Sequence, residues 1–118
     1  MAPPDRLEQL LENIRSFVRE RDWEQYHDPK NLTMAVASEA GELSAVLRWV
    51  HNDEADERAK GTHRPALEAE VADVAICLLM LCDRVGIDLV RAAHAKLEQN
   101  RQKYPADVVR GRADTPSA

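Results

Sequence analysis

Two pairs of carboxylates stand at helical spacing in this chain: Glu39 with Glu42, and Glu70 with Asp73. Residues three apart on a helix project from one face, so each pair directs two carboxylates the same way. Four carboxylates that met between two helices would repel one another and lose hydration. A hard divalent cation that prefers oxygen ligands, Mg²⁺ or Mn²⁺, relieves both costs. The pattern therefore predicts a divalent metal site, provided that the two pairs converge.

The apolar residues around the first pair indicate that it faces a helix–helix contact. A helix expected over residues 31–51 has an apolar stripe of Leu32, Val36, Leu43, Val46, Leu47 and Val50. At about 100° per residue, Glu39 falls near the middle of this stripe and Glu42 about 60° to one side. Glutamate is almost never fully buried without a partner. Glu39 is therefore expected to share its position with a cation or a basic group.

The second pair lies beside the apolar stripe of another expected helix, over residues 65–85, with Cys77 next to it. The two pairs can therefore meet between the helices. The alternative is four surface charges with lysine or arginine partners, and spacing alone leaves both interpretations open. A di-iron site is disfavoured because it needs two Glu-x-x-His pairs. The chain has one, Glu24 to His27, and it lies next to a proline.

Helix-forming residues dominate the composition and glycine is scarce, which favours an all-α fold. Apolar spacing predicts four helices, over residues 5–21, 31–51, 65–85 and 88–104. The expected boundary signals are Asn31 and Asp88 as N-caps, Pro65 in a first turn and Gly86 as a C-cap. Residues 52–64 are polar and are expected to form a loop. We expect one domain over residues 1–110 and a disordered tail over residues 111–118.

The third helix is apolar nearly all round in its middle, because Ile76, Leu79 and Met80 lie off its main stripe. Such a helix is normally buried on every side. A four-helix monomer of this size cannot easily cover it, so we predict an oligomer whose interface uses this helix. The alternative is a central helix in a monomer.

Charge and hydropathy exclude several classes of protein. The 118-residue chain has a formal net charge of -5, which argues against binding to nucleic acid or to an anionic membrane. Its longest apolar run, Val74 to Cys82, is far shorter than the roughly 20 residues of a membrane span. The N-terminus shows no secretory signal. Two thiols that are too far apart around a helix to bond, Cys77 and Cys82, fit a reducing cytoplasm.

Basic and aromatic residues could complete a binding site. Lys96, Asn100 and Lys103 form one polar stripe near the end of the fourth helix, with Arg101 nearby. This stripe can hold phosphate oxygens, or it can simply complement the helix dipole. Trp23 and Trp49 can each stack on a base or pack in a core or interface.

The acidic pairs and their flanking segments resemble a known family. Glu39-Ala-Gly-Glu42 followed by Glu70-Val-Ala-Asp73 resembles the all-α NTP pyrophosphatase superfamily, which includes MazG-like proteins and dCTP pyrophosphatases. The match to the dCTP pyrophosphatase group is carried by five segments in order, within roughly residues 6 to 112. These segments are Arg21-Asp-Trp-Glu-Gln-Tyr-His27, Pro29-Lys-Asn-Leu32, Glu39-Ala-Gly-Glu42-Leu43, Glu70-Val-Ala-Asp73-Val74 and Asn100-Arg-Gln-Lys-Tyr-Pro105.

The resemblance implies a four-helix MazG-like bundle assembled as a dimer or, as we favour, a tetramer. It implies an enzyme that hydrolyses a nucleoside triphosphate to the monophosphate and diphosphate. Glu39, Glu42, Glu70 and Asp73 would then be the catalytic, Mg²⁺-binding carboxylates. The implied substrate-binding residues are Trp23, Glu24, His27, Trp49, Cys77, Lys96, Asn100, Arg101 and Tyr104.

Two departures from the family affect the expected substrate. The animal dCTP pyrophosphatases have a pocket histidine where this chain has Ile14, and a tyrosine where it has Cys77. Both changes remove hydrogen-bonding groups, and a site that loses such groups discriminates less. We therefore expect a cytoplasmic pyrophosphohydrolase for dCTP or a related or modified pyrimidine dNTP, with a role in nucleotide-pool cleaning. The alternative is a non-catalytic helical partner-binding or regulatory module with a vestigial metal site.

Overall fold

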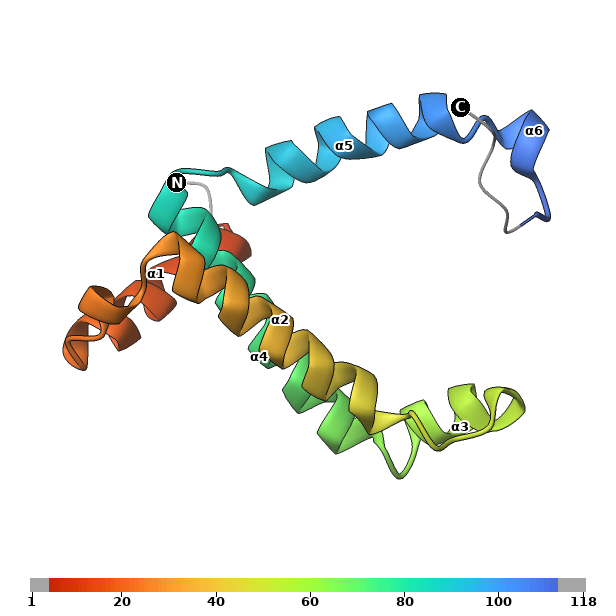
Figure 1. Cartoon of the computed structure of the whole chain (residues 1–118), viewed down its shortest axis with the longest axis horizontal. Coiled ribbons are helices and arrows are strands. Elements are labelled where there is room, and N and C mark those ends of the chain that lie inside the picture. The colour runs from red at the N-terminus through yellow and green to blue at the C-terminus, as the bar shows by residue number, and fades with distance from the viewer. Residues whose placement is uncertain (1–4, 113–118) are drawn as a thin grey trace. The chain divides into compact units, whose positions relative to one another are not determined.

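The computed structural model describes residues 5–112, and all regular structure in this range is helical. The four long helices are α1 (Arg6–Glu20), α2 (Pro29–Val46), α4 (Arg64–Val85) and α5 (Leu89–Lys103) (Figure 1). The short elements between and after them are η1 (Glu24–Tyr26), η2 (Asn52–Glu54), α3 (Ala55–Lys60) and α6 (Ala106–Val109). The expected all-α class and the four long helices are confirmed.

The contacts divide the chain into two units, one ending at Gly86 and the other beginning at Ile87. Each unit is described by itself. The prediction of one domain over residues 1–110 stays a prediction. Of the expected disordered tail, Gly111 and Arg112 are described and exposed, while residues 113–118 lie outside the described part of the chain.

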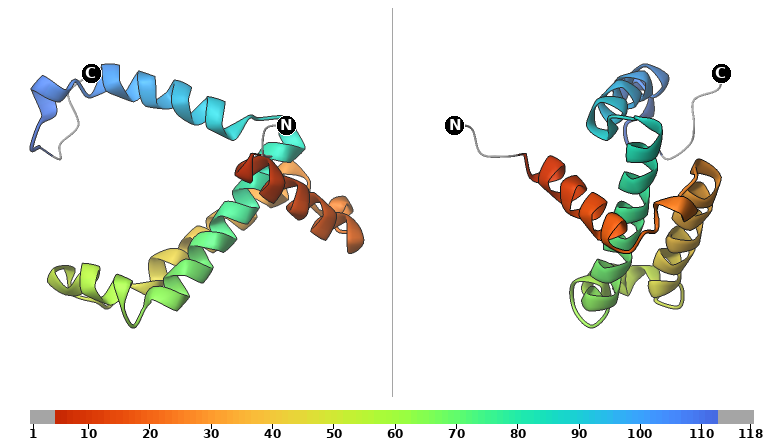
Figure 2. Two further views of the ribbon diagram at one scale, coloured as in Figure 1. Left: turned by 180° about the vertical axis from the view of Figure 1, so that it is seen from behind. Right: turned by 90° about the vertical axis from the view of Figure 1, so that its left-hand side faces the viewer.

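The first unit is built on a pair of antiparallel helices, α2 and α4, which lie side by side along most of their length (Figures 1 and 2). Helix α1 crosses α4 near the C-terminal end of α4. The buried apolar residues lie mainly where these three helices meet: Ile14, Val18, Leu32, Leu79 and Cys82. The acidic pairs lie further along α2 and α4, away from this core.

The N-cap of helix α2 lies three residues earlier than predicted. Asp28, not Asn31, is its N-cap, since the Asp28 carboxylate accepts a hydrogen bond from the Asn31 backbone N–H at 2.9 Å. Pro29 then occupies the first helical position, where a missing N–H costs nothing. The Asn31 side chain instead donates to the Tyr26 carbonyl at 3.0 Å, which ties the helix to η1.

The predictions for the end of α2 and for residues 52–64 were also wrong. Helix α2 ends at Val46, and the chain turns where the Val50 N–H donates to the Leu47 carbonyl at 2.9 Å. Neither glycine nor proline marks this point, so the sequence pattern carried no stop signal. The polar segment contains η2 and the short helix α3, which has acidic residues in its first turn and basic residues in its last. That arrangement complements the helix dipole.

Helix α4 has the boundaries that its sequence signals predict. Pro65 lies in the first turn, and Gly86 caps the C-terminus with a φ of 75°, a left-handed conformation that glycine adopts without strain. Asp88 caps α5 by accepting a hydrogen bond from the Arg91 N–H at 3.1 Å. None of the helices within residues 5–112 combines the length and apolar character that a membrane crossing requires.

The apolar circumference of α4 is only partly covered within the first unit. Leu79 and Cys82 are buried, whereas Val71 and Val85 are 51% and 44% exposed. The expected complete burial of this helix is therefore not reached within the first unit. That the remaining surface is covered by a second copy stays a prediction.

Candidate functional site

The two acidic pairs converge where α2 and α4 run side by side. One carboxylate oxygen from each of Glu39, Glu70 and Asp73 lies within 4.8 Å of the other two. Glu39 comes from α2, and the other two come from successive turns of α4. No salt bridge from a lysine or arginine to any of the three is found within residues 5–112. The arrangement therefore differs from surface charges with basic partners. That these residues are ligands stays a prediction.

Two oxygens in this cluster are buried and unsatisfied. Among the described residues, Oε2 of Glu39 and Oε2 of Glu70 have no hydrogen-bond partner. Unpaired buried carboxylate oxygens are costly. Burial raises the pKa of Glu39, and the charges of Glu42 and Asp73 raise it further. A divalent cation would supply the missing partner, and an all-oxygen donor set fits Mg²⁺ or Mn²⁺.

Glu42 belongs to the cluster electrostatically but lies outside its tightest part. Burial is the main cause of the raised pKa of Glu70, and the charge of Glu42 is the largest of the charge effects on it. The Glu42 side chain is exposed, whereas those of Glu39 and Glu70 are half-buried. Glu42 can therefore approach a ligand from the solvent side.

Cys77 lies one helical turn beyond Asp73, on the same face of α4. Its thiol is free and half-buried. Burial raises the pKa of Cys77, and the nearby charges of Glu39 and Asp73 raise it further. Since the pKa rises, the thiol form is favoured near neutral pH. Cys82 is also free, so the expectation that the two cysteines do not bond is confirmed.

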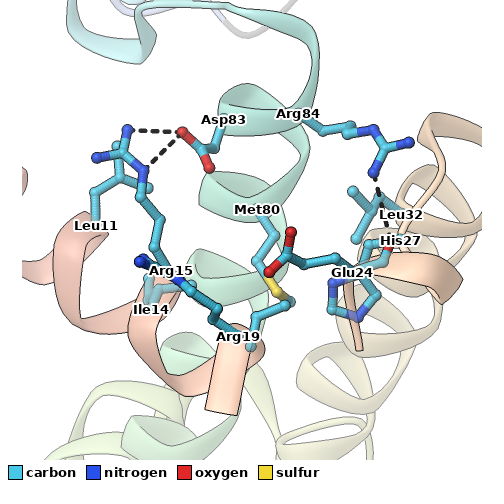
Figure 3. Close-up of a pocket in the computed structure, with 11 residues that line it drawn as sticks. Leu11, Ile14, Arg15, Arg19, Glu24, His27, Leu32, Met80, Asp83 and Arg84 are labelled. Carbon is cyan, nitrogen blue, oxygen red and sulfur yellow. Dashed lines mark hydrogen bonds and ion pairs between the residues drawn. The ribbon is translucent and has the colours of Figure 1, made fainter. Parts of the chain in front are cut away.

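A cavity of about 340 Å³ opens beyond Cys77, between α1, η1 and the last turns of α4 (Figure 3). One side is apolar and is lined by Leu11, Ile14, Val18, Leu32 and Met80. The polar groups around it include Glu24, His27 and Arg84. Arg15, Arg19 and Asp83 line it as well, so apolar and charged groups share the lining, which suits a small molecule that has both apolar and polar parts.

The cavity and the carboxylate cluster lie along the same faces of α2 and α4. Met80 lies seven residues after Asp73 on α4, and Leu32 lies seven residues before Glu39 on α2. Seven residues are two helical turns, so the two places share a face and are about 10 Å apart along the helices. A molecule bound at the carboxylates can therefore reach the cavity. Arg84 lies on this same face, four residues beyond Met80, a spacing that could have identified it from the sequence.

The predicted aromatic residues have different surroundings. Trp23 packs edge-on against Phe17 with ring centroids 5.8 Å apart, and it is 43% exposed. Trp49 follows the end of α2 and is 85% exposed, with the Arg48 guanidinium 5.4 Å from its ring centroid. Neither ring lines the cavity, whereas Glu24 and His27 do.

The predicted phosphate-binding residues lie in the second unit. Lys96 is exposed on α5, and Asn100 is half-buried. Arg101 forms an ion pair with Glu98 at 3.0 Å. Tyr104 caps α5, its N–H donating to the Asn100 carbonyl at 2.8 Å. These residues lie along the C-terminal half of α5 and at its cap.

Comparison with known proteins identifies relatives of this chain. The chain is 42% identical over 111 residues to dCTP pyrophosphatase 1 of Rattus norvegicus, covering 90% of this chain and 65% of the relative. It is 40% identical over 108 residues to dCTP pyrophosphatase 1 of Homo sapiens, covering 87% of this chain and 64% of the relative. The chain thus spans just under two thirds of the length of these relatives. No family model matches it.

A solved structure shares both sequence and fold. A pyrophosphatase from Archaeoglobus fulgidus DSM 4304 superimposes with a TM-score of 0.83 at 37% identity, covering 89% of this chain and 97% of that chain. Identity at this level over nearly the whole of that protein shows common descent. The chain belongs to the all-α NTP pyrophosphatase superfamily of MazG-like proteins, and its curated relatives are dCTP pyrophosphatases.

Proposed function

We propose that this protein is a Mg²⁺-dependent nucleoside triphosphate pyrophosphohydrolase, which converts a (d)NTP and water to the (d)NMP and diphosphate. The observation that carries the proposal is the convergence of Glu39, Glu70 and Asp73, two of which have a buried, unsatisfied oxygen. The names of the relatives, dCTP pyrophosphatase 1 and a pyrophosphatase, support the same reaction.

The four carboxylates would hold the cation, Mg²⁺ or alternatively Mn²⁺, with Glu42 approaching from solvent. When bound, the cation neutralises phosphate charge and makes a coordinated water more acidic. The carboxylates of the chain would hold the cation at the α2–α4 contact, and they would not bind the phosphates directly because like charges repel. One of them, or a neighbouring carboxylate, accepts the proton of the attacking water. Attack in line at phosphorus then releases diphosphate.

The nucleoside would occupy the cavity beyond Cys77. Its distance from the carboxylates along α4 suits a nucleoside joined to a bound triphosphate. Ile14 contributes an apolar surface there, and Glu24 and His27 supply polar groups. We propose dCTP or a related or modified pyrimidine dNTP as the substrate, with looser base selection because Ile14 and Cys77 offer little hydrogen bonding.

We propose that the active form is a homo-oligomer, a tetramer in preference to a dimer. The partly exposed apolar residues of α4, Val71 and Val85, offer a surface that a second copy would cover. Lys96, Asn100, Arg101 and Tyr104 would contact phosphates. Trp23 and Trp49, which do not line the cavity, would contact the substrate outside it. The acidic net charge of -5 supports a free nucleotide, and neither nucleic acid nor a membrane, as the partner. The free thiols support a cytoplasmic location, where the enzyme would clean the nucleotide pool.

The proposal is tested by incubating the protein with a panel of dNTPs in Mg²⁺ or in excess chelator. The expected products are dNMP and diphosphate in a one-to-one ratio, formed only with the cation. Orthophosphate as the first product would indicate a different bond cleavage. Absence of cation-dependent turnover of every nucleotide would favour a non-catalytic module.

A further inference from the structure

Two consecutive residues at the end of α4 hold opposite sides of the cavity (Figure 3). Asp83 Oδ1 accepts hydrogen bonds from Arg15 on α1, at 2.7 Å from Nη2 and 3.0 Å from Nε. Arg84 donates to the Glu24 carbonyl in η1 at 3.4 Å. The side that Asp83 holds carries Ile14 and Arg19, and the side that Arg84 holds carries Glu24 and His27.

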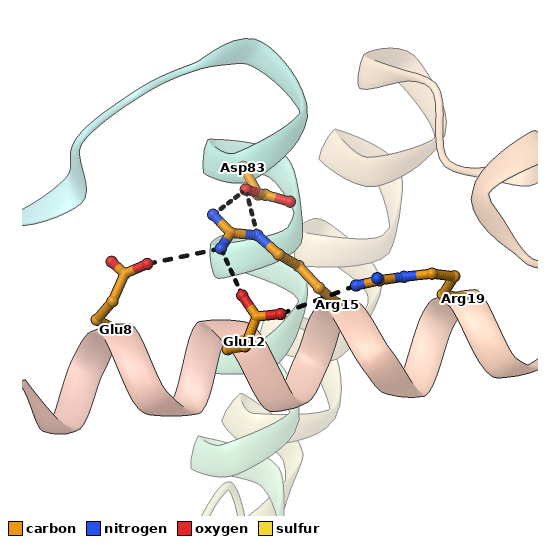
Figure 4. A network of polar contacts seen from close by, with 5 residues as sticks. All are labelled: Glu8, Glu12, Arg15, Arg19 and Asp83. Atoms are coloured by element: carbon orange, nitrogen blue, oxygen red, sulfur yellow. Dashed lines mark hydrogen bonds and ion pairs between the residues drawn. The ribbon is translucent and has the colours of Figure 1, made fainter. Parts of the chain in front are cut away.

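Arg15 is committed to this structural contact. Besides Asp83, its guanidinium contacts Glu12 at 3.1 Å and Glu8 at 3.5 Å, both on α1 (Figure 4). Hydrogen bonds to Asp83 and Glu12 raise the pKa of Arg15 above its ordinary value. The surrounding carboxylates offset its charge, so Arg15 is poorly suited to bind phosphate itself. Its contacts join helix α1 to helix α4.

Helix α1 has few buried contacts with the rest of the first unit. Only Ile14 and Val18 of α1 are buried, and both line the cavity. Within residues 5–112, the bonds from Arg15 to Asp83 are the only hydrogen bonds or ion pairs between α1 and α4. Two donors of one guanidinium on the same oxygen restrict the direction of the contact more than one hydrogen bond would. A small rotation of α1 would move the apolar wall of the cavity.

We propose that Arg15 and Asp83 are positioning residues for the nucleoside pocket: their contact fixes α1 against α4, and thereby sets the width of the pocket between Ile14 and Met80. The inference rests on the proposed function, since it assigns the nucleoside to this cavity. The pair touches neither the carboxylate cluster nor the reacting phosphates. It therefore controls how well the base end of the substrate is held, and not the chemical step.

The test compares steady-state kinetics of Arg15→Ala, Asp83→Ala, the double variant and Asp83→Asn, which keeps the side-chain volume. We expect KM for the best dNTP to rise about 5-fold or more, with kcat changed less than about 2-fold. Discrimination between bases should also decrease. Because the two residues act through one contact, the double variant should be no worse than either single variant. Asp83→Glu keeps a carboxylate, so its KM should rise less than that of Asp83→Ala.

A matched control is Arg64→Gln, which removes an ion pair between Arg64 and Glu68 at 3.7 Å on α4 that joins no second element. Its KM should equal that of the wild type. Unchanged KM and base preference in the folded Arg15 and Asp83 variants, verified by circular dichroism, would overturn the inference while leaving the proposed function intact. A fall in kcat while KM stays unchanged would also overturn the inference. A wild-type protein without cation-dependent turnover would instead refute the proposed function, and this inference with it.

Discussion

Glu39 on α2 and Glu70 on α4 each hold one carboxylate oxygen buried and without a hydrogen-bond partner among residues 5–112. The two side chains come from helices that run antiparallel, and Asp73 joins them within 4.8 Å. A protein seldom retains two such groups together without a ligand that uses them. In this chain the two unsatisfied oxygens support the proposed cation site, and the cation site supports the proposed reaction at phosphate.

Glu39→Gln should reduce kcat for dNTP hydrolysis at least about 100-fold, since even residues that only support metal ligands cost 10–100-fold. The fold should survive, because Gln has nearly the same volume and removes a charge that burial disfavours. Diphosphate release and circular dichroism measure the two effects. Ser38→Ala, an exposed neighbour, serves as the control. Activity near the wild-type level in Glu39→Gln would rule it out as a ligand.

The cation-free protein should lose stability as the pH rises. In the folded state the pKa values of Glu39 and Glu70 are raised above their ordinary value of 4.5, so the folded protein binds more protons than the unfolded chain. By linkage, stability contributed by these groups falls as the pH passes from 4.5 through the raised values.

Melting temperatures in chelator at about pH 5 and about pH 8 measure this effect. Glu70→Gln should show a smaller loss between the two values than the wild type, and Mg²⁺ should restore stability mainly at the higher pH. If the melting temperature of the variant changed with pH as that of the wild type does, the pH-dependent loss of stability would not come from this cluster.

Cys77 should react slowly with iodoacetamide near neutral pH, because burial raises its pKa and the thiolate is the reactive form. Its rate should rise with pH, and a dNTP with Mg²⁺ should protect it if the substrate passes beside it. Labelling followed by peptide mass spectrometry separates Cys77 from the more deeply buried Cys82. Rapid labelling at neutral pH that nucleotide leaves unchanged would be inconsistent with its position.

Leu32→Ala should reduce the free energy of unfolding by about 2–5 kcal/mol, because Leu32 is only 2% exposed where α2 meets the cavity and the core. Met34 lies on the same helix and is 60% exposed, so Met34→Ala should change it by less than about 0.5 kcal/mol. Denaturant titration gives both values. Equal losses would mean that the burial of α2 differs from that described.

Light scattering tests the proposed assembly. The uncovered apolar residues of α4 predict a species larger than one chain at micromolar concentration, with a tetramer favoured over a dimer. Replacing exposed Val71 by Glu should shift the population toward smaller species, because it places a charge on the surface proposed to be covered. A wild-type monomer at that concentration would contradict the proposal.

The sequence allowed the helices and the acidic cluster to be predicted because both depend on local periodicity. The position of Glu39 within an apolar stripe already indicated a buried carboxylate, and Gly86 and Pro65 marked the ends of α4. The end of α2 was predicted wrongly because the turn after Val46 has no glycine or proline. Its start was predicted wrongly because Asp28, and not Asn31, is the N-cap.

The parts that could not be predicted depend on contacts between distant segments. Arg15 and Asp83 are 68 residues apart, and each alone resembles an ordinary surface charge. The pairing becomes visible only once α1 is placed across α4. Arg84 could have been found, because it continues the face of α4 that carries Asp73 and Met80. The cavity itself follows from the crossing of three helices.

The central claim, that the convergent carboxylates form one divalent cation site, is tested most directly by titrating Mn²⁺ into nucleotide-free protein and following free Mn²⁺ by electron paramagnetic resonance. The account predicts saturable binding in the wild type that is weakened at least about 10-fold in both Glu39→Gln and Glu70→Gln. Binding of equal strength in all three proteins, or none in the wild type with or without a non-hydrolysable dNTP, would contradict it.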